Sequence, residues 1–244
     1  MITSQLFSID DFIGFLKLSD TKHSEEDFES IVLKEQDDLL RDLLPADIYL
    51  DIISDVNAAN PNAGEASKQK FIDLLNGTNY IDDKTRILRG AIEAFIYFTY
   101  YTAVQEEHYQ NATTGTSVSK NENSEPVSRS QLNVQTNKRR NIGVDYYKEL
   151  ADFVTFFKEI KEEYTTIVEG PPGTYTVTLE STKYLNVTDT IEINGEEFSV
   201  LVSIDPDVDI VFTSDAGLTF DDGGSILWKP FKDASPVEKS PMFW

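Results

Sequence analysis

The chain has no cysteine and only two histidines among its 244 residues. Without cysteine it can form no disulfide, thiol nucleophile or zinc–thiolate site. His23 and His108 have neither a second histidine at helical spacing nor a neighbouring ligand cluster, as a metal site would require. The phosphate-binding loop, the G-x-G-x-x-G fingerprint and the G-x-S-x-G nucleophile elbow are missing too. We therefore expect a protein that is not an enzyme and that uses no metal or cofactor.

Long hydrophobic runs are also lacking, and we expect no secretory leader. The most apolar stretch, residues 91–104, is shorter than a membrane span and contains Glu93. Residues 1–12 lack a basic segment followed by an apolar core, which argues against a secretory signal. We expect no membrane partner, and assembly in a reducing cytoplasm.

Positive charge is scarce, with 21 lysines and arginines against 43 aspartates and glutamates, a net charge of −22 and a pI near 4.3. Such a surface opposes passive coating of DNA, which depends on neutralising phosphates with lysine and arginine. Two interpretations remain open. The charge maintains solubility, or acidic surfaces line a passage through which nucleic acid slides without adhering.

Apolar spacing predicts an α+β chain, with a helical domain over residues 1–168 and a small all-β domain over residues 169–244. The helical patterns run over 24–44, 46–56, 66–75, 85–108 and 144–164. Aromatic residues fall on two sides of each of the last two, longer helices. They serve either one core within the chain or the packing of neighbouring subunits. The candidates for subunit packing are Phe95, Tyr97, Tyr101, Tyr146, Phe153 and Phe156.

A polar loop over residues 109–143 separates the two long helices. A loop of that length without periodic structure is usually functional or disordered. It carries five bases against two acids in an otherwise acidic chain. These bases are either solvated or directed to an acidic patch on a neighbouring copy or partner. They are Lys120, Arg129, Lys138, Arg139 and Arg140.

Strand patterns follow the Gly170-Pro171-Pro172-Gly173 segment. Alternation over 191–204 around Asn194-Gly195 predicts a hairpin, because Asn-Gly is the strongest short turn signal. The other expected strands, which make roughly six in all, run over 174–179, 208–214, 217–220 and 225–231.

The chain ends in the large apolar residues Met242, Phe243 and Trp244, which follow Pro236 and Pro241. The prolines disfavour helix and central strand. This tail therefore either docks on a partner or folds onto its own domain.

Residues 71–164 combine several motifs in a characteristic order. An L-L-x-G-x-x-Y element leads into a long aromatic helix, and the closing helix is entered through Asn141-Ile142-Gly143. The loop between them carries Asn111, Gly115, Asn121, Ser124, Pro126 and Val127. This arrangement resembles the head–tail connector proteins of tailed bacteriophages, in the version found in crAss-like phages.

The resemblance implies a structural virion protein that forms a ring, usually of twelve copies, at the portal vertex. The ring would join capsid to tail and continue the DNA channel. Its partners would be the portal protein, further tail or collar rings, and genomic DNA that passes through the lumen without sequence-specific binding. The subunits would assemble in the host bacterial cytoplasm. The C-terminal β domain departs from the pattern, because minimal connectors lack it.

Two other functions remain open. A carbohydrate-binding or host-surface-binding protein would use aromatic residues of the β domain such as Tyr175, Tyr184 and Trp228. A hydrolase related to sialidases is suggested by residues 213–220, which resemble an Asp-box hairpin. Such an enzyme needs an arginine cluster nearby, and residues 166–244 contain no arginine.

Overall fold

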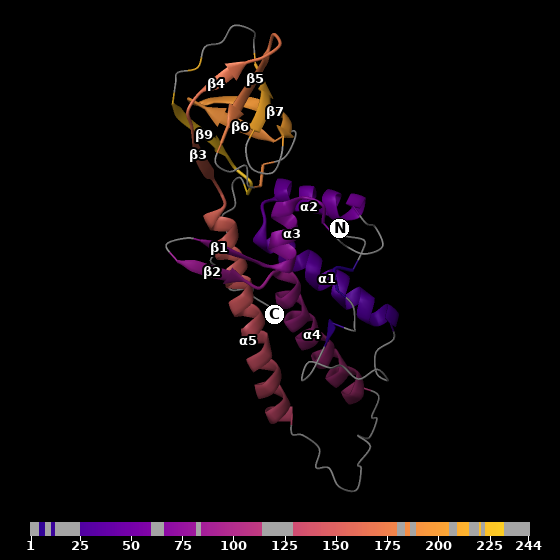
Figure 1. Ribbon diagram of the computed structural model, residues 1–244. Coiled ribbons are helices and arrows are strands. Elements are labelled where there is room, and N and C mark those ends of the chain that lie inside the picture. The colour runs from indigo at the N-terminus through magenta and orange to yellow at the C-terminus, as the bar shows by residue number, and fades with distance from the viewer. Residues whose placement is uncertain are drawn as a thin grey trace. The chain divides into compact units, whose positions relative to one another are not determined.

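The fold was analysed in a computed structural model (Figure 1). It describes residues 5–7, 11–12, 25–59, 66–81, 84–113, 129–179, 184–185, 189–204, 209–214, 220 and 223–231. The predicted α+β class is confirmed for these residues, with helices concentrated in the first part and an antiparallel sheet in the second. The chain divides into two compact units. The helical unit is residues 1–67, 71–153 and 236–244, and the sheet unit is residues 68–70 and 154–235.

The described helices are α1 (Glu25–Leu43), α2 (Ala46–Ala59), α3 (Gln69–Asn76), α4 (Ala91–Thr113) and α5 (Arg129–Phe156). Pro45 separates α1 from α2, as its missing amide and rigid ring predict. Its carbonyl oxygen then accepts the Tyr49 amide at 2.8 Å, which starts the hydrogen bonding of α2. The short helices of the first part therefore follow the sequence pattern closely.

A β-hairpin stands where the sequence pattern predicts the first turns of a long helix. Strands β1 (Thr78–Ile81) and β2 (Thr85–Leu88) pair antiparallel, and α4 begins only at Ala91. The predicted helix start at Thr85 is therefore wrong. The reason lies in Gly90, which has φ +93° and so ends the strand in a backbone conformation that a helix cannot contain.

The predicted loop over residues 109–143 is largely helical. Helix α4 continues to Thr113 and α5 already begins at Arg129, so that only residues 114–128 lie outside the described structure. Residues 129–143 have no apolar stripe, because this part of α5 is held by contacts of arginine with tyrosine rather than by burial of aliphatic side chains. The loop prediction is thus wrong over residues 109–113 and 129–143.

The core of the helical unit forms around α4. Helix α1 packs mainly against α4, and the Thr102 hydroxyl donates to Glu35 Oε1 at 2.8 Å across that contact. The N-terminal segment packs on its own chain, where Leu6, Phe7 and Phe12 are buried. The largest side chains that are fully buried in this core are Leu39, Leu40, Phe71, Phe95, Phe98 and Phe153.

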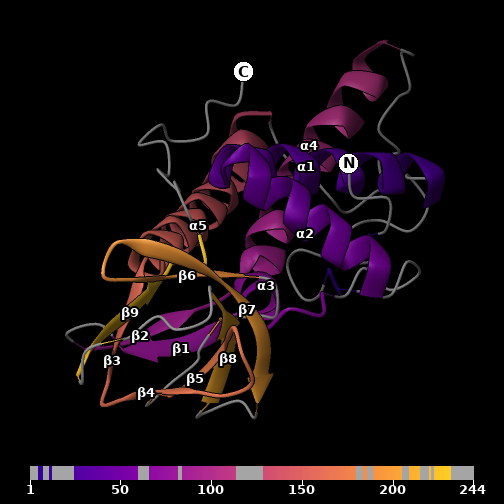
Figure 2. The same cartoon turned by 90° about the horizontal axis from the view of Figure 1, so that it is seen from above.

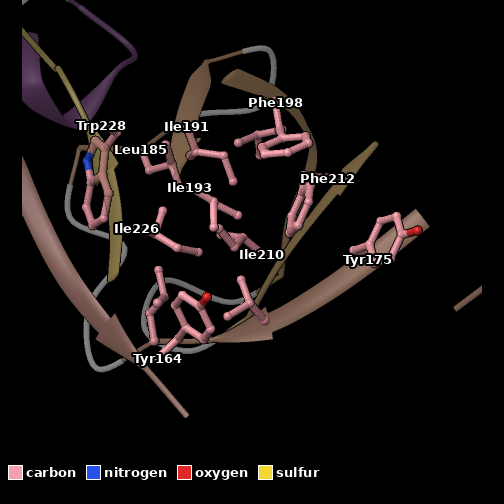
Figure 3. Packing of buried hydrophobic residues seen from close by; sticks show 13 residues of the cluster. Tyr164, Tyr175, Leu185, Ile191, Ile193, Phe198, Ile210, Phe212, Ile226 and Trp228 are labelled. Carbon is pink, nitrogen blue, oxygen red and sulfur yellow. The ribbon is translucent and has the colours of Figure 1, made fainter. Parts of the chain in front are cut away.

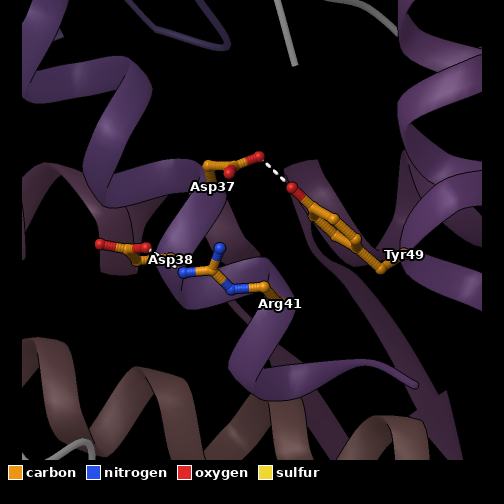
Figure 4. A network of polar contacts seen from close by, with 4 residues as sticks. All are labelled: Asp37, Asp38, Arg41 and Tyr49. Carbon is orange, nitrogen blue, oxygen red and sulfur yellow. Dashed lines mark hydrogen bonds and ion pairs between the residues drawn. The ribbon is translucent and has the colours of Figure 1, made fainter. Parts of the chain in front are cut away.

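A buried polar contact joins α1 to α2 (Figure 4). The Tyr49 hydroxyl donates to Asp37 Oδ1, and both side chains are buried. Burial and the neighbouring carboxylate raise the pKa of Tyr49 to about 12. On the exposed side of α1, Arg41 pairs with Asp38 one turn away. The buried carboxylate therefore keeps a neutral phenol as its donor throughout the physiological pH range.

The sheet unit contains seven described strands, all antiparallel, in the order β3-β9-β6-β7-β8-β5-β4. Their bounds are β3 Ile160–Tyr164, β4 Ile167–Glu169, β5 Thr174–Thr178, β6 Thr190–Ile193, β7 Glu196–Ile204, β8 Asp209–Thr213 and β9 Gly224–Trp228. The sheet therefore begins before the predicted domain boundary at residue 169. Its two edge strands, β3 and β4, are joined by two residues only, so the sheet curls until it nearly closes on itself.

The predicted strands are largely present. Asn194 and Gly195 have φ values of +53° and +85°, the left-handed pair that a two-residue hairpin turn requires, and the hairpin of β6 and β7 is confirmed. The predicted strand over 217–220 lies outside the described residues except for Phe220. Side chains from the concave side of the sheet fill one core, which includes Ile191, Phe198, Ile210, Phe212, Ile226 and Trp228 (Figure 3).

Candidate partner interface

Helices α4 and α5 come close to each other at Gly143, which is buried on α5. A Cβ atom at this position would lie 3.0 Å from Tyr97 Cβ and 3.4 Å from Phe98 Cζ. The lack of a side chain therefore leaves room for Tyr97 and Phe98 at this point, and longer side chains connect the two helices on both sides of it.

On the N-terminal side of Gly143, two arginines of α5 stack on tyrosines of α4. The Arg139 guanidinium carbon lies 4.9 Å from the centre of the Tyr100 ring, and its Nη1 donates to the Tyr100 hydroxyl. The Arg140 guanidinium lies 5.6 Å from the centre of the Tyr101 ring. These distances are typical of cation–π contacts.

On the other side of Gly143, a third contact between arginine and tyrosine is formed by Arg89, which follows the hairpin, and Tyr146 of α5. Arg89 lies 4.7 Å from the Tyr146 ring centre and its Nη1 donates to Glu149 Oε1 at 2.6 Å. The Tyr146 ring meets Tyr97 edge-on at 5.6 Å. These contacts lie between α4 and α5, and we call the residues that form them the arginine–tyrosine seam. They are Arg89, Tyr97, Tyr100, Tyr101, Arg139, Arg140 and Tyr146.

The surroundings of two seam residues, Arg89 and Tyr97, raise their pKa values. Glu149 raises the pKa of the Arg89 guanidinium, which remains charged. Burial, with a further contribution from Tyr146 and Glu93, raises the pKa of the Tyr97 phenol, which remains neutral. Cationic guanidinium groups and neutral rings are the combination that cation–π attraction needs. The seam therefore joins α4 to α5 through contacts between arginine and tyrosine.

Arg139 and Arg140 thus differ from their predicted role. Both were expected on a loop that reaches a neighbour or partner, whereas they lie on α5 and contact α4 of their own chain. Lys138, on the same turn, is exposed. Of the other predicted loop bases, Arg129 is the first residue of α5 and its side chain is outside the described structure, as is all of Lys120. The predicted tail contacts Met242, Phe243 and Trp244 also lie outside it.

The candidates for subunit packing divide into three groups by their burial. Phe95 and Phe153 are fully buried in the chain's own core, so these two assignments are wrong. Tyr97, Tyr101 and Tyr146 are half-buried in the seam, where one side of each ring is already used within the chain. Phe156, at the last position of α5, is 40% exposed. Helical periodicity could not separate these cases, because both faces of α4 are apolar.

The aromatic residues proposed for carbohydrate binding are in the core of the sheet unit. Tyr175, Tyr184 and Trp228 are each at most 3% exposed. Tyr175 stacks on Phe212, and Tyr184 meets Phe157 edge-on. None of the three rings offers a flat face to a sugar. The residues assigned to this alternative function are therefore structural.

Over the described residues, no group of three or more histidine, aspartate or glutamate side chains is arranged to hold a metal ion. Helices in the same part of the chain are too short or too polar to span a bilayer. Both findings concern only the described ranges.

Residues 50–165 match a family model. It is described as a family of unknown function, DUF6712. No curated protein and no solved structure matches the chain. The matched stretch holds most of α2, the hairpin, α4 and α5, so every residue of the seam lies inside it.

Apolar side chains that the sequence analysis did not single out are exposed on the helical unit. The exposed fractions are 62% for Leu50 on α2, 73% for Ile81 and 65% for Ile87 on the hairpin, and 66% for Val134 on α5. The sequence carries no clear signal for the two isoleucines, because Thr78–Ile81 and Thr85–Leu88 each end in two consecutive apolar residues and do not alternate. Only Gly77 and Gly90 mark the ends of this segment.

Proposed function

We propose that this protein is a non-enzymatic structural subunit of a bacteriophage virion, and that it forms a ring at the junction of capsid and tail. The proposal rests on the resemblance of residues 71–164 to head–tail connectors. The stretch that matches the family model of unknown function, residues 50–165, contains these residues. As in the connector family, the ring would hold about twelve copies, contact the portal protein and further tail or collar rings, and continue the DNA channel.

The observation that carries the proposal is the exposed apolar surface of the hairpin. Tyr80 and Leu88 are buried on its inner face, while Ile81 and Ile87 are 73% and 65% exposed on its outer face. An isolated two-stranded ribbon is only marginally stable in water, and apolar residues gathered on one exposed face commonly mark an interaction site. A ribbon that is apolar on both faces is suited to lie between its own helices and another molecule.

Two further features are consistent with a ring around DNA. The seam fixes α4 against α5, which would give each subunit a constant shape for packing side by side. The net charge of −22 opposes binding to phosphates, as a channel wall requires if DNA is to pass without adhering.

The test is the size of the purified protein, measured by mass photometry and viewed by negative-stain electron microscopy, alone and with portal protein. We expect rings, or self-association that increases with concentration, at physiological salt. A gel-shift assay with double-stranded DNA should show no binding. A protein that stays monomeric at high concentration and does not bind portal rings would contradict the proposal.

A further inference from the structure

The chain contains two Asn-Gly sequences, Asn76-Gly77 and Asn194-Gly195, whose surroundings in the structure differ. Asparagine before glycine is the pair that most readily loses its side-chain amide in water, because glycine has no side chain to shield the backbone nitrogen that attacks the asparagine. This reaction, deamidation, begins when the glycine nitrogen approaches the asparagine Cγ. In a folded chain, it therefore depends on whether the peptide between the two residues can rotate.

Asn194 and Gly195 form the turn between β6 and β7, which lie side by side in the sheet unit (Figures 1 and 2). Ile193 pairs with Glu196 across the turn, and a two-residue hairpin has its nearest ladder hydrogen bonds at that flanking pair. Both turn residues are exposed, and a Cβ on Gly195 would meet no atom of the described structure within 4 Å. The central peptide of this turn therefore has space to rotate.

The backbone angles of the turn show how the reactive geometry is reached. The φ values of Asn194 and Gly195, +53° and +85°, are those of a type I′ turn. Rotation of the central peptide alone converts type I′ into type II′, the other turn that suits a two-residue hairpin. In type II′ the first turn residue has ψ of about −120°, which directs the Gly195 nitrogen toward the Asn194 Cγ. Gly195 allows the rotation because it lacks a Cβ.

The surroundings of Asn76-Gly77 oppose the same movement. The Gly77 amide donates to the Asp73 carbonyl oxygen at 2.9 Å, which continues the hydrogen bonding at the end of α3. A Cβ on Gly77 would lie 2.5 Å from the Leu88 carbonyl oxygen, so the backbone here is in close contact with the end of β2. Attack by the Gly77 nitrogen would require loss of that hydrogen bond and separation of the two ends of the β1–β2 hairpin.

We infer that Asn194 is a site of spontaneous deamidation in the folded protein and that Asn76 is protected. The Gly195 nitrogen forms a bond to the Asn194 Cγ, the bond from Cγ to Nδ2 breaks, and Nδ2 leaves as ammonia with the proton that the Gly195 nitrogen gives up. One water then opens the cyclic imide. Attack of water at Cγ gives aspartate, whereas attack at the backbone carbonyl carbon gives isoaspartate, in which the main chain runs through the former side chain.

The two products affect the hairpin differently. Aspartate preserves the turn, because Asp-Gly also favours type I′, and it adds a negative charge beside Glu196 and Glu197, which are exposed. Isoaspartate inserts a methylene into the main chain of the turn. The register that buries Ile193 and Phe198 depends on turn length, so isoaspartate should weaken the sheet unit. This inference does not depend on the proposed ring.

Peptide mapping by mass spectrometry tests the inference on full-length protein incubated at mildly alkaline pH. We expect deamidation at Asn194 to be about tenfold or more faster than at Asn76, which corresponds to a barrier lower by about 1.4 kcal/mol or more. A protein isoaspartyl methyltransferase, which methylates isoaspartate and not aspartate, should label the peptide that contains residue 194. Asn194→Gly should abolish this label while preserving the turn, since Gly-Gly also favours type I′. Asn76→Gln should leave the label unchanged.

The same incubation in concentrated urea separates the effect of the fold from that of local sequence. The two rates should converge in the unfolded chain, because the contacts that protect Asn76 are then lost. Equal rates in the folded protein, or faster loss at Asn76, would overturn the inference. A rate at Asn76 that remains as slow in urea would also overturn it, since the protection would then come from neighbouring residues. Freshly purified Asn194→Asp, which reproduces the aspartate product, should denature at the same urea concentration as the wild-type protein.

Discussion

The interiors of the two units are stabilised by different kinds of contact. In the sheet unit, side chains such as Phe212 and Trp228 meet in one apolar core inside a curled sheet. In the helical unit, an apolar core around α4 is supplemented by polar links between helices, including the seam and the Tyr49–Asp37 contact. A curled sheet brings one face of every strand to a common centre, whereas straight helices leave their outer ends without such a centre. Directed polar contacts fix those ends instead.

The largest expected effect concerns the sheet core. Phe212 is fully buried and its ring contacts Tyr175, Phe198 and Phe220. Phe212→Ala should lower the free energy of unfolding of the sheet unit by about 3–5 kcal/mol, because it leaves a cavity. Urea denaturation followed by tryptophan emission measures this. Val168→Ala, at an exposed position of β4, is the matched control and should change stability by less than about 0.5 kcal/mol.

The next effect concerns the contact between α1 and α2. Tyr49→Phe removes the donor to the buried Asp37 carboxylate and should cost about 1.5–3 kcal/mol. The pH dependence follows from the pKa of Tyr49, which is about 12 in the folded chain and about 10 when unfolded. The stabilisation is complete below pH 10 and is lost as pH rises to 12, since only the unfolded chain ionises in that window.

Chemical denaturation monitored by circular dichroism at a series of pH values tests this prediction. The wild-type protein should lose more stability than Tyr49→Phe between pH 10 and pH 12. Parallel curves for the two proteins would show that the hydrogen bond does not control this titration.

The close approach of α4 and α5 gives the third prediction. Gly143→Val would push a branched side chain against Tyr97 and Phe98 and should destabilise the helical unit by about 1–3 kcal/mol. Asn141→Val, at an exposed position of the same helix, is the control, because it measures the cost of placing a valine in this helix without a clash against α4. Thermal unfolding by circular dichroism should separate the two variants. Equal melting temperatures would mean that the helices can move apart at no cost.

The smallest expected effect concerns a single cation–π contact. Arg139→Lys keeps the charge but loses the planar stack on Tyr100, so it should cost about 0.5–1 kcal/mol. Lys138→Gln, in which an exposed charge is removed one residue away, should have almost no effect on stability. A larger loss for Lys138→Gln than for Arg139→Lys would contradict the assignment of the seam.

The difference between the units also explains what could be predicted from sequence. The hairpin of β6 and β7 was predicted because strict alternation and Asn194-Gly195 are local signals that tertiary contacts did not override. Strand β3 was missed, because three consecutive charged residues separate its two apolar residues, Ile160 and Tyr164. Its apolar residues also fit the end of the preceding helix, and four or five residues are too few to distinguish the two periods.

The first half of α5 was missed for a physical reason. Residues 129–143 show no apolar stripe, since their anchors are Arg139 and Arg140, and arginine in a polar segment normally indicates a solvated loop. When an arginine of one helix contacts a tyrosine of another, the sequence of neither helix shows a periodic apolar stripe that would reveal the contact. Likewise, sequence could not show that Phe95 is buried while Ile87 is exposed, because both are apolar residues in one continuous pattern.

The hairpin is joined to the helices through two glycines that touch each other. Gly77 and Gly90 both have positive φ, and a Cβ on either would come within 2.5 Å of backbone atoms on the other side of the pair. Neither position can therefore accept a larger residue unless the two ends of the hairpin separate from each other. The hairpin is thus joined to the helices at a junction whose backbone leaves no room for a side chain.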